Sequence, residues 1–575
     1  MLKPACLKVP SIPNFTSVLQ SQGSSASPQG ANVPNEVLSE DGNQSQAMIP
    51  WRDLCLLLVV VGLAAIVQVN VAGRSGLWAD EVFSLAMATG HSLEHPAAAA
   101  DSALGDFVEP DHPVPAEEFR RYLKHDSPAA SPARVVRAVL LSDTSPPLYY
   151  LLLYGWTLMF GTSDTMLRLF SIGWSLACLP VLASVARRTG GRDAVFPACV
   201  LFAFSPLGIY YSTEGRMYSL LWLCVLATTW ASLALHERRG GIPIYALWVV
   251  ASAAGFLTHY FFVFPWLGLV AYLFIRPGQL SRTRLTVCLL LIGLIALPWY
   301  SKLPESLASW RITHDWLKWQ PAGFHRLAAS RELVIQFFSG RCQYLWLDDR
   351  TSNLAALMLF GIVAVTMAWR LRIHAFGGER LLLWLLFAAA CAGPLVFDFV
   401  QHTYTVAFSR YAIAALPVAC LLAAVGLSCL GRRTRLIMLA LIVLAWAPNV
   451  LSIYRNQSRS WSPIREISRA ACANGSPSDL ILIHSIPSGV LGIARYADGP
   501  AELASWVGQL RTRRVPESLN ALTAGRTRIV FVNVHAVGEP APEKEWLRAH
   551  AAVFHKTRLD SGRIIDFRPI NSATF

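Results

Sequence analysis

Two adjacent carboxylates, Asp80 and Glu81, follow the first long apolar segment of the chain, residues 54–72. That segment carries no charge and has the ~20-residue length that a helix needs to cross a bilayer. A carboxylate held at a membrane surface can act as a general base, which removes a proton from a hydroxyl or an amine. The alternative is a hydrated loop, where solvated Asp and Glu carry no function. The remainder of the chain decides between the two interpretations.

The composition is that of a membrane protein. The 575 residues are 54% hydrophobic and only 15% charged, with a mean hydropathy of +0.41. Soluble domains carry about 25% charge, so the chain is too apolar for that class. The net charge of +13 does not indicate nucleic-acid binding, because Arg and Lys lie mostly in short loops between apolar segments. The eleven cysteines contain no CxxC pair and lie mostly in apolar runs, which indicates neither a disulfide framework nor a metal cluster.

Eleven apolar runs predict eleven membrane-spanning helices. They are residues 54–72, 167–186, 194–211, 217–235, 242–258, 261–275, 285–300, 354–368, 381–400, 411–430 and 436–453. Arginine clusters follow every second run, and such clusters mark cytoplasmic loops. All of these arginine clusters fall on one side of the membrane only if residues 146–160 do not cross it. This short segment opens with two prolines and is rich in Tyr and Trp, which predicts a helix lying in the outer interface. The N-terminus is then cytoplasmic and the C-terminus lies outside.

This topology brings the unusual polar features of the chain to one face of the membrane. They are Asp80 and Glu81, residues 143–147, Arg168, residues 210–218, 258–260, 301–350 and 401–411. Polar groups gathered at one face of an apolar bundle indicate a site there. The cytoplasmic loops are short and basic and offer little chemistry.

The composition also predicts the domain organisation. Residues 1–50 are rich in Ser, Gln, Asn and Pro and predict a disordered cytoplasmic tail. Residues 51–454 form the predicted transmembrane domain, with outer loops 73–145 and 301–350 and the interfacial helix 146–160. Residues 455–575 predict a small α/β domain outside the membrane, with a helix over 463–472 and strands over 479–484, 528–535 and 563–567. Its expected role is to pack over the site or to recognise an acceptor.

The order and spacing of several motifs resemble one family, the membrane-embedded glycosyltransferases of the GT-C fold. The specific resemblance is to the superfamily of protein O-mannosyltransferases and aminoarabinose transferases. Its elements are the Asp80-Glu81 pair, Ser145–Tyr150 (SPPLYY), Leu167–Ser171 (LRLFS), Tyr210–Tyr218 (YYSTEGRMY) and Ser409–Tyr411 (SRY). Together they cover roughly residues 50–450. Ser145 replaces the His that is usual in the family, and Gly215 stands where Ala is usual.

The resemblance implies an all-α GT-C fold and transfer of a sugar from a polyprenyl-phosphate carrier to an acceptor on the outer side. It implies that Asp80 is the general base, with Glu81 as its catalytic neighbour, and that the anomeric carbon is inverted. The leaving group is then a lipid phosphate, which Arg168, Arg216 and Arg410 can hold through forked, charge-assisted hydrogen bonds. The expected partners are this donor, membrane lipid and a glycan, lipid or protein acceptor.

Several of the predicted substrate-binding residues have a simpler interpretation. The full set is Arg168, Tyr211, Glu214, Arg216, Tyr218, His259, Arg410 and Tyr411. An Arg at the end of a span can extend to lipid headgroups, as Arg410 can, and Arg168 can close a helix end or hold Asp80 in place. Glu214 and Arg216 can pair with other loop residues, and His259 can be a hydrogen-bonded packing residue.

No cofactor is predicted. Asp111-His112, His314-Asp315 and Asp348-Asp349 could supply metal ligands, but no ligand motif such as HExxH appears, so a divalent metal is possible without being indicated. Two alternative functions are a transporter or flippase of a lipid-linked or small solute, and a scaffold that has lost activity. A transporter usually has repeated halves and polar residues at the midplane, whereas here the charges gather at the ends of spans. A bacterial inner membrane is the expected location, with the C-terminal domain in the periplasm.

Overall fold

The computed structural model describes residues 51–575 apart from residues 144, 238–240, 278–280, 309–315, 319, 321–324, 343–349, 456–462, 536–539, 560–561 and 571–573. The predicted disordered tail over residues 1–50 and much of the predicted loop 301–350 lie outside the described residues.

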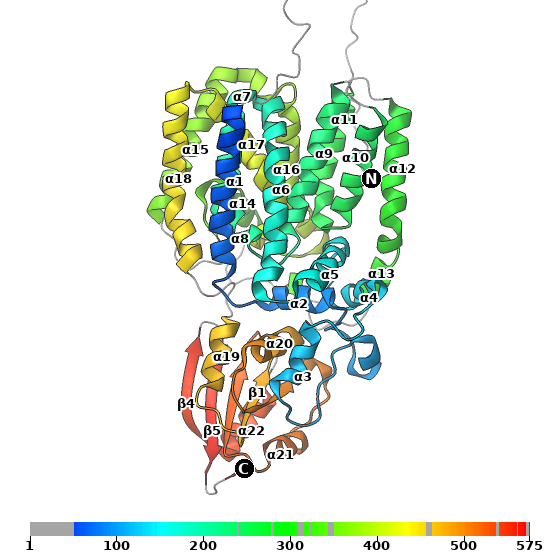
Figure 1. Ribbon diagram of the computed structural model, residues 1–575, viewed down its shortest axis with the longest axis vertical. Helices are drawn as coiled ribbons and strands as arrows, with labels where there is room; N and C mark the ends of the chain where they lie inside the picture. Colours follow the sequence, from blue (N-terminus) through cyan, green and yellow to red (C-terminus); the bar gives the residue numbers. More distant parts are fainter. Residues whose placement is uncertain are drawn as a thin grey trace, which may run out of the picture. The chain divides into compact units, whose positions relative to one another are not determined.

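Within the described residues, seven helical segments are long and apolar enough to cross a membrane. The helices that form them are α1 (Trp51–Ala72), α6 (Asp164–Gly190), α9 (Tyr218–His236), α12 (Arg282–Tyr300), α15 (Arg350–Leu371), α16 (Arg380–Gln401) and α18 (Arg432–Arg455). Three shorter apolar helices stand in the same bundle in Figure 1: α10 (Ile242–Phe256), α11 (Val263–Ile275) and α17 (Leu416–Ser428). The chain is therefore an integral, mostly helical membrane protein.

A bent helix pair supplies the remaining predicted run. The helices α7 (Arg192–Phe204) and α8 (Pro206–Ser212) meet at an angle of 58°. Pro206 cannot donate a backbone hydrogen bond, so α7 ends before it and α8 restarts with Ser205 as its cap. All eleven predicted runs thus lie in helices, while the number that cross the membrane beyond the seven stays a prediction.

The exposed apolar side chains show which helices face lipid. In α1, Leu58 and Ile66 are each 60% exposed, and α12, α15 and α18 likewise expose large apolar residues. In α9, by contrast, 83% of the apolar window is buried. A helix apolar on all sides is stable inside a bundle or against lipid, but not against water. The apolar outer surface of the bundle is thus a lipid-facing surface.

Short helices lie at one end of the bundle and position the polar residues. They include α2 (Ala79–Ala88), α4 (Pro132–Ser142) and α5 (Leu148–Phe160), which lie together in Figure 1, and α3 (Ala116–Arg120), which packs on α20. Another is α13 (Leu303–Ala308), whereas α14 (Arg326–Ser339) packs within the bundle against α15 and α16. Short 3-10 turns are η1 (Ala97–Ala99), η2 (Ser102–Leu104), η3 (Arg121–Leu123), η4 (Tyr260–Phe262), η5 (Trp316–Lys318), η6 (Arg372–Phe376), η7 (Thr405–Ala407), η8 (Ser409–Tyr411), η9 (Ile413–Ala415) and η10 (Gly508–Leu510).

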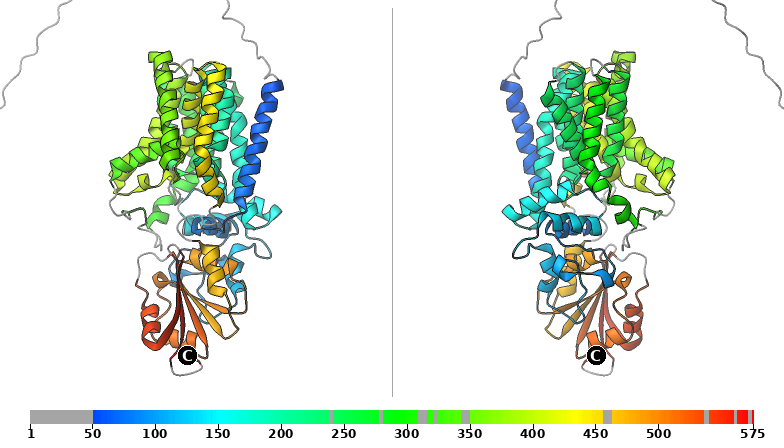
Figure 2. Two further views of the ribbon diagram at one scale, coloured as in Figure 1. Left: turned by 90° about the vertical axis from the view of Figure 1, so that its left-hand side faces the viewer. Right: turned by 90° about the vertical axis from the view of Figure 1, so that its right-hand side faces the viewer.

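The C-terminal region is an α/β unit with one five-stranded sheet in the order β2-β1-β3-β5-β4. Strands β2 (Glu502–Trp506), β1 (Asp479–His484) and β3 (Arg528–Asn533) are parallel, whereas β5 (Gly562–Pro569) and β4 (Ala551–Leu559) add antiparallel pairs. The helices are α19 (Ile464–Cys472), α20 (Pro487–Tyr496), α21 (Glu517–Thr523) and α22 (Pro542–His550). Figure 2 shows this unit, in orange and red, at the end of the bundle that carries α2.

The two faces of the sheet belong to different cores. Ile481 and Ile483 of β1 join the apolar cluster that continues into α19, α20 and the bundle. The alternate residues Leu480 and Leu482 face a separate cluster under α21 and α22. Successive side chains of a strand point to opposite faces, so one β1 run contributes to both cores.

The predicted strands all exist, with small differences at their ends. Strand β1 has the predicted bounds, β3 ends two residues earlier than predicted, and β5 is longer. Strands β2 and β4 were not predicted. Strand β4 is an edge strand whose residues are mostly exposed, so its sequence carries no apolar alternation.

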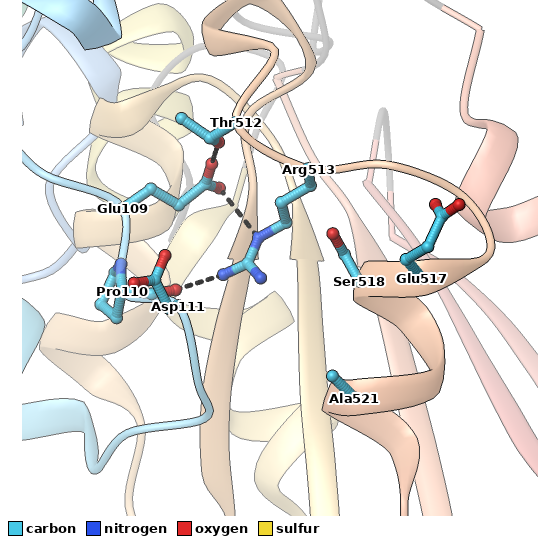
Figure 3. Close-up of a pocket in the computed structure, with 8 residues that line it drawn as sticks. All are labelled: Glu109, Pro110, Asp111, Thr512, Arg513, Glu517, Ser518 and Ala521. Carbon is cyan, nitrogen blue, oxygen red and sulfur yellow. Dashed lines mark hydrogen bonds and ion pairs between the residues drawn. The ribbon is translucent and has the colours of Figure 1, made fainter.

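Residues 73–145, which we call the first polar loop, are fastened to the C-terminal sheet. Val114 and Leu503 of β2 exchange two backbone hydrogen bonds of 2.9 and 2.8 Å. Figure 3 shows a second contact beside a small pocket, where Glu109 faces Thr512 and Arg513. The Glu109 Oε1 atom accepts a 2.9 Å hydrogen bond from the Val507 amide and lies 3.6 Å from the Arg513 Nε. Burial raises the pKa of the Glu109 carboxyl although the Arg513 charge opposes it.

We expect the first polar loop to lose stability in acid because of His91. This side chain is 3% exposed, and burial lowers its pKa to about 4 although Asp126 lies 3.4 Å from its Nε2. The unfolded state therefore binds more protons between pH 6.5 and about 4, so the contribution of His91 is complete above pH 6.5 and is lost as the pH falls through this window. The difference corresponds to ~3 kcal/mol.

Thermal unfolding in nanodiscs at several pH values measures this effect. His91→Gln should lower the acid sensitivity, whereas His112→Gln, at an exposed site of the same loop, should leave it unchanged. Equal acid sensitivity in the wild type and His91→Gln would contradict the prediction.

Candidate active site

The adjacent carboxylates have different surroundings. Asp80 and Glu81 occupy the first turn of α2, where the positive end of the helix dipole favours carboxylates. Neighbouring residues of a helix point about 100° apart, so the two side chains face different environments. The Asp80 side chain is 25% exposed, whereas that of Glu81 is fully buried.

Glu81 forms a buried ion pair with Arg168 of α6. The Arg168 Nε and Nη2 atoms donate to the Glu81 carboxylate over 2.8 and 2.6 Å. The Arg168 Nη1 atom donates to the Ala72 and Ser75 carbonyls, and its Nη2 donates to that of Gly76. A guanidinium has five N–H groups, and these contacts use all of them. Arg168 therefore has no N–H left for a phosphate, and it anchors the α1–α2 loop and Glu81 instead of taking the predicted substrate contact.

Glu81 also connects α2 to the turn before α9. Its Oε1 atom accepts a 2.9 Å hydrogen bond from the Gly215 amide. A Cβ atom at residue 215 would lie 2.5 Å from the Leu167 Cγ atom, which is too close for a real contact. The glycine thus lets this turn approach α6, and the departure from the family motif at residue 215 has a packing reason.

Asp80 faces Arg410, which lies 330 residues later in η8. The Arg410 Nη1 atom donates to the Asp80 Oδ2 atom over 2.8 Å, and both side chains are partly exposed. The Arg410 guanidinium also lies 5.3 Å from the centre of the Phe408 ring and 5.4 Å from that of Tyr411. A carboxylate and a cation that both reach solvent can interact with a substrate, unlike the sealed Glu81–Arg168 pair.

Arg216 forms a second polar cluster next to Asp80. Its Nη2 atom donates to Asp143 over 3.1 Å, and its Nη1 atom donates to the Tyr150 hydroxyl over 3.1 Å. The Tyr150 hydroxyl in turn donates to Asp143. Burial raises the pKa of the Asp143 carboxyl, but the Arg216 charge and the hydrogen bonds from Ser145 outweigh it and lower the pKa. Asp143 is therefore held as a carboxylate.

The remaining predicted residues form an aromatic and polar surround. Tyr211 is buried, and its hydroxyl lies 2.9 Å from the Ser409 Oγ atom. The Tyr218 ring packs edge-on against Tyr211, with its centre 6.2 Å from that of His259. Tyr411 joins them through Phe261, at 5.0 Å between ring centres, and Glu214 is buried.

His259 is a neutral hydrogen-bonding group. Burial and the charge of Arg216 lower its pKa to about 3. Its Nδ1 atom accepts a hydrogen bond from the Phe261 amide, so the proton of the neutral ring is on Nε2. His259 thus caps η4 through Nδ1 and keeps one N–H donor, while its contact with substrate stays a prediction.

Three residues of this site were absent from the predicted set: Asp143, Tyr150 and Ser84. Asp143 and Tyr150 lie in polar or motif stretches that the sequence singles out, but nothing local indicates that both contact Arg216. Ser84 follows Asp80 by one helical turn, and its hydroxyl accepts a 3.3 Å hydrogen bond from Arg216. The i, i+4 spacing was the available signal.

Among the described residues, no group of three or more His, Cys, Asp or Glu side chains could hold a metal ion. The site consists of two partly exposed carboxylates, Asp80 at 25% and Asp143 at 23%, two arginines that each contact an acid, and neutral hydroxyl and imidazole groups. Such a set can accept a proton at Asp80 and neutralise an anion at the arginines.

Comparisons with known proteins bear on this arrangement. Residues 144–301 match the family model described as dolichyl-phosphate-mannose-protein mannosyltransferase. The solved structure of ArnT from Cupriavidus metallidurans bound to undecaprenyl phosphate is similar at a TM-score of 0.57 and 14% identity, covering 90% of this chain and 99% of that one. Its apo form gives a TM-score of 0.56 and 13% identity, with 91% and 99% covered. The apo oligosaccharyltransferase of Archaeoglobus fulgidus gives a TM-score of 0.46 and 11% identity, with 84% and 70% covered. No curated protein matches the sequence.

Proposed function

Because this chain has the GT-C fold of polyprenyl-phosphate-dependent membrane glycosyltransferases, we propose that it transfers a monosaccharide from a polyprenyl-phosphate carrier to an acceptor. The reaction takes place at the outer face of a bacterial inner membrane, with the N-terminus cytoplasmic and the C-terminal domain periplasmic. Asp80 is the general base, and the anomeric carbon is inverted. The acceptor is a glycan, a lipid or a protein.

The contact between Asp80 and Arg410 is the observation that supports this function best. A general base has to reach the acceptor, and the Asp80 side chain keeps 25% of its surface exposed at the polar end of the bundle. Arg410 lies 2.8 Å away, where it can receive the charge that develops on the departing phosphate. An inverting displacement places the base and the leaving group on opposite faces of the anomeric carbon, so the bound donor and acceptor separate Asp80 from Arg410 in this proposal.

Proton transfer, bond formation and departure of the carrier occur in one displacement. The acceptor O–H or N–H loses its proton to the Asp80 carboxylate, and the acceptor atom forms a bond to the anomeric carbon. The bond between that carbon and the phosphate oxygen breaks, and the polyprenyl phosphate leaves with the electron pair. Arg410 and Arg216 balance its charge, and no step requires a metal ion.

The other predicted residues act around this step. Glu81 and Arg168 position α2 and do not contact substrate. Tyr211, Tyr218, His259 and Tyr411 line the surround with hydroxyl groups, one N–H and aromatic rings, which are groups that bind sugars and exclude water. Asp143 and Tyr150 hold the Arg216 fork in place.

Arg410→Ala is expected to weaken donor binding about 10- to 100-fold, because a charge-assisted fork on the phosphate is lost. Arg410→Lys should recover only part of this, since an ammonium keeps the charge but not the fork. The measurement is the apparent KM for a polyprenyl-phosphate sugar in proteoliposomes. An unchanged KM in both variants would remove Arg410 from the phosphate site.

The function itself is tested in proteoliposomes with radiolabelled monosaccharides linked to undecaprenyl or dolichyl phosphate. Cleavage of the carrier bond by the wild type supports a transferase. Movement of intact carrier across the bilayer without cleavage would establish the alternative, a transporter of a lipid-linked solute. Absence of both activities with every carrier would favour the inactive scaffold.

A further inference from the structure

The loop between α1 and α2, residues 73–78, carries Asp80 into the site and is held from two sides. From the bundle, Arg168 donates to the carbonyls of Ala72, Ser75 and Gly76. From the C-terminal unit, the amide of Leu77 donates to the hydroxyl of Tyr496 over 2.7 Å. Tyr496 is the last residue of α20 and lies more than 400 positions away in the sequence.

The Tyr496 hydroxyl makes this contact and one other. It accepts from Leu77 and donates to the Asp164 Oδ2 atom over 2.5 Å. The neighbouring Arg495 donates to the other oxygen of Asp164 and to the Thr162 carbonyl, both over 2.7 Å. Asp164 is the first residue of α6, and Arg168 follows it by one helical turn. One hydroxyl therefore joins the C-terminal unit, the start of α6 and the loop before Asp80.

The packing around this hydroxyl is close. A Cβ atom at Gly76 would lie 2.6 Å from the Arg465 Cβ atom and 3.4 Å from the Tyr496 ring, so the loop backbone rests on α19 and α20. Arg465 also donates to the Arg74 carbonyl. Gly492 of α20 faces Val82, two residues after Asp80. In Figure 1, α20 lies directly against α2, and α19 packs on α20.

We infer that Tyr496 is a positioning residue for Asp80: the C-terminal unit sets the place of the catalytic carboxylate through α20. The inference rests on the proposed function. Arg168 and Arg465 hold carbonyl groups of the loop, and the hydrogen bond to Tyr496 holds the amide of Leu77, two residues before α2. Without it the loop and the first turn of α2 gain freedom, and Asp80 meets the acceptor and Arg410 less often in a reactive geometry.

The rest of the contact between the first polar loop and the C-terminal unit does not depend on Tyr496. Arg120 donates to the Ala494 carbonyl, Val114 pairs with β2, and Glu109 faces Arg513 (Figure 3). These contacts keep the C-terminal unit in place when one hydroxyl is removed. Tyr496→Phe therefore tests positioning rather than attachment of the domain.

The first measurement is hydrogen exchange of the full-length protein in nanodiscs, which needs no substrate. In Tyr496→Phe the peptide spanning residues 73–84 is expected to exchange about 10-fold faster, the equivalent of one lost hydrogen bond. The matched control is Tyr122→Phe, which removes a hydroxyl that accepts from the Val108 amide elsewhere in the first polar loop. The control should leave residues 73–84 unchanged. Unchanged exchange of this peptide in Tyr496→Phe would overturn the inference.

The second measurement is turnover with the radiolabelled polyprenyl-phosphate sugar that the wild type consumes. Tyr496→Phe should lower kcat about 10- to 100-fold with little change in the donor KM, because placement of the base is lost and the phosphate site is intact. Asp164→Asn should act in the same direction from the other end of the hydroxyl. A lower kcat accompanied by a large change in the donor KM would contradict the positioning role. Wild-type turnover despite faster hydrogen exchange would contradict it as well.

The two proposals fail in different ways. If Asp80→Asn retains full transfer, the proposed base is wrong whatever Tyr496→Phe does. If Asp80→Asn is inactive and Tyr496→Phe equals the wild type, the function stands and the inference about Tyr496 falls.

Discussion

Asp80→Asn is expected to lower the rate of sugar transfer about 10²- to 10⁴-fold, the range that a positioned general base contributes. The amide has nearly the same size but cannot accept the proton of the acceptor. Asn also keeps an oxygen that can accept from Arg410, so the site should stay folded and donor binding should change only a few-fold. The measurement is kcat and donor KM in proteoliposomes with a radiolabelled polyprenyl-phosphate sugar.

Glu118→Gln is the matched control for this variant. Glu118 lies in the same polar loop, its side chain is 56% exposed, and its ion pair with Arg121 is on the surface. Exposed pairs contribute ~0–1 kcal/mol, so neither turnover nor stability should change measurably. Transfer by Asp80→Asn at the rate of Glu118→Gln would show that another group removes the proton.

Arg168→Met is expected to destabilise the fold by ~3–5 kcal/mol, because it leaves the Glu81 carboxylate buried without its cation. The variant also removes the donors to the Ala72 carbonyl at the end of α1 and to the Ser75 and Gly76 carbonyls of the loop. The double variant Arg168→Met/Glu81→Gln should recover part of the loss, since no uncompensated charge stays buried. The measurement is thermal unfolding in detergent or nanodiscs.

Arg410→Met provides the contrast. Its pair with Asp80 is partly exposed, so its removal should cost little stability while lowering activity. If Arg168→Met unfolds at the temperature of the wild type, the pair with Glu81 is not a structural anchor. If Arg410→Met is the less stable of the two, the assignment of the two arginines is reversed.

Local sequence identifies the residue types of this site but not their separate roles. The pair Asp80-Glu81 and the arginines were recognised from their types and positions, but the roles of neighbours could not be separated. Because neighbouring side chains of α2 point in different directions, Glu81 contacts Arg168 and Asp80 contacts Arg410. Both partners come from distant segments. The same holds for Asp143 and Tyr150, whose contact with Arg216 depends on how α4, α5 and the turn before α9 meet.

The class of the protein and the positions of its helices follow from the sequence. Apolar runs without charge have to satisfy their backbone within the segment, so their positions follow from composition alone. The family motifs, read in order, pointed to the GT-C fold and to the polar end of the bundle. The edge strand β4 is not predicted from the sequence, because its exposed residues carry no periodic apolar pattern.

Which polar groups are sealed and which are accessible depends on the three-dimensional packing and does not follow from the sequence. The packing uses every N–H of Arg168 inside the protein, leaves Asp80 partly exposed beside Arg410, and brings Tyr496 of the C-terminal unit to the loop before Asp80. The physical reason is that burial and hydrogen bonding are properties of groups far apart in the chain. A residue type indicates what a side chain can do, and its three-dimensional neighbours determine whether it anchors the fold or meets a substrate.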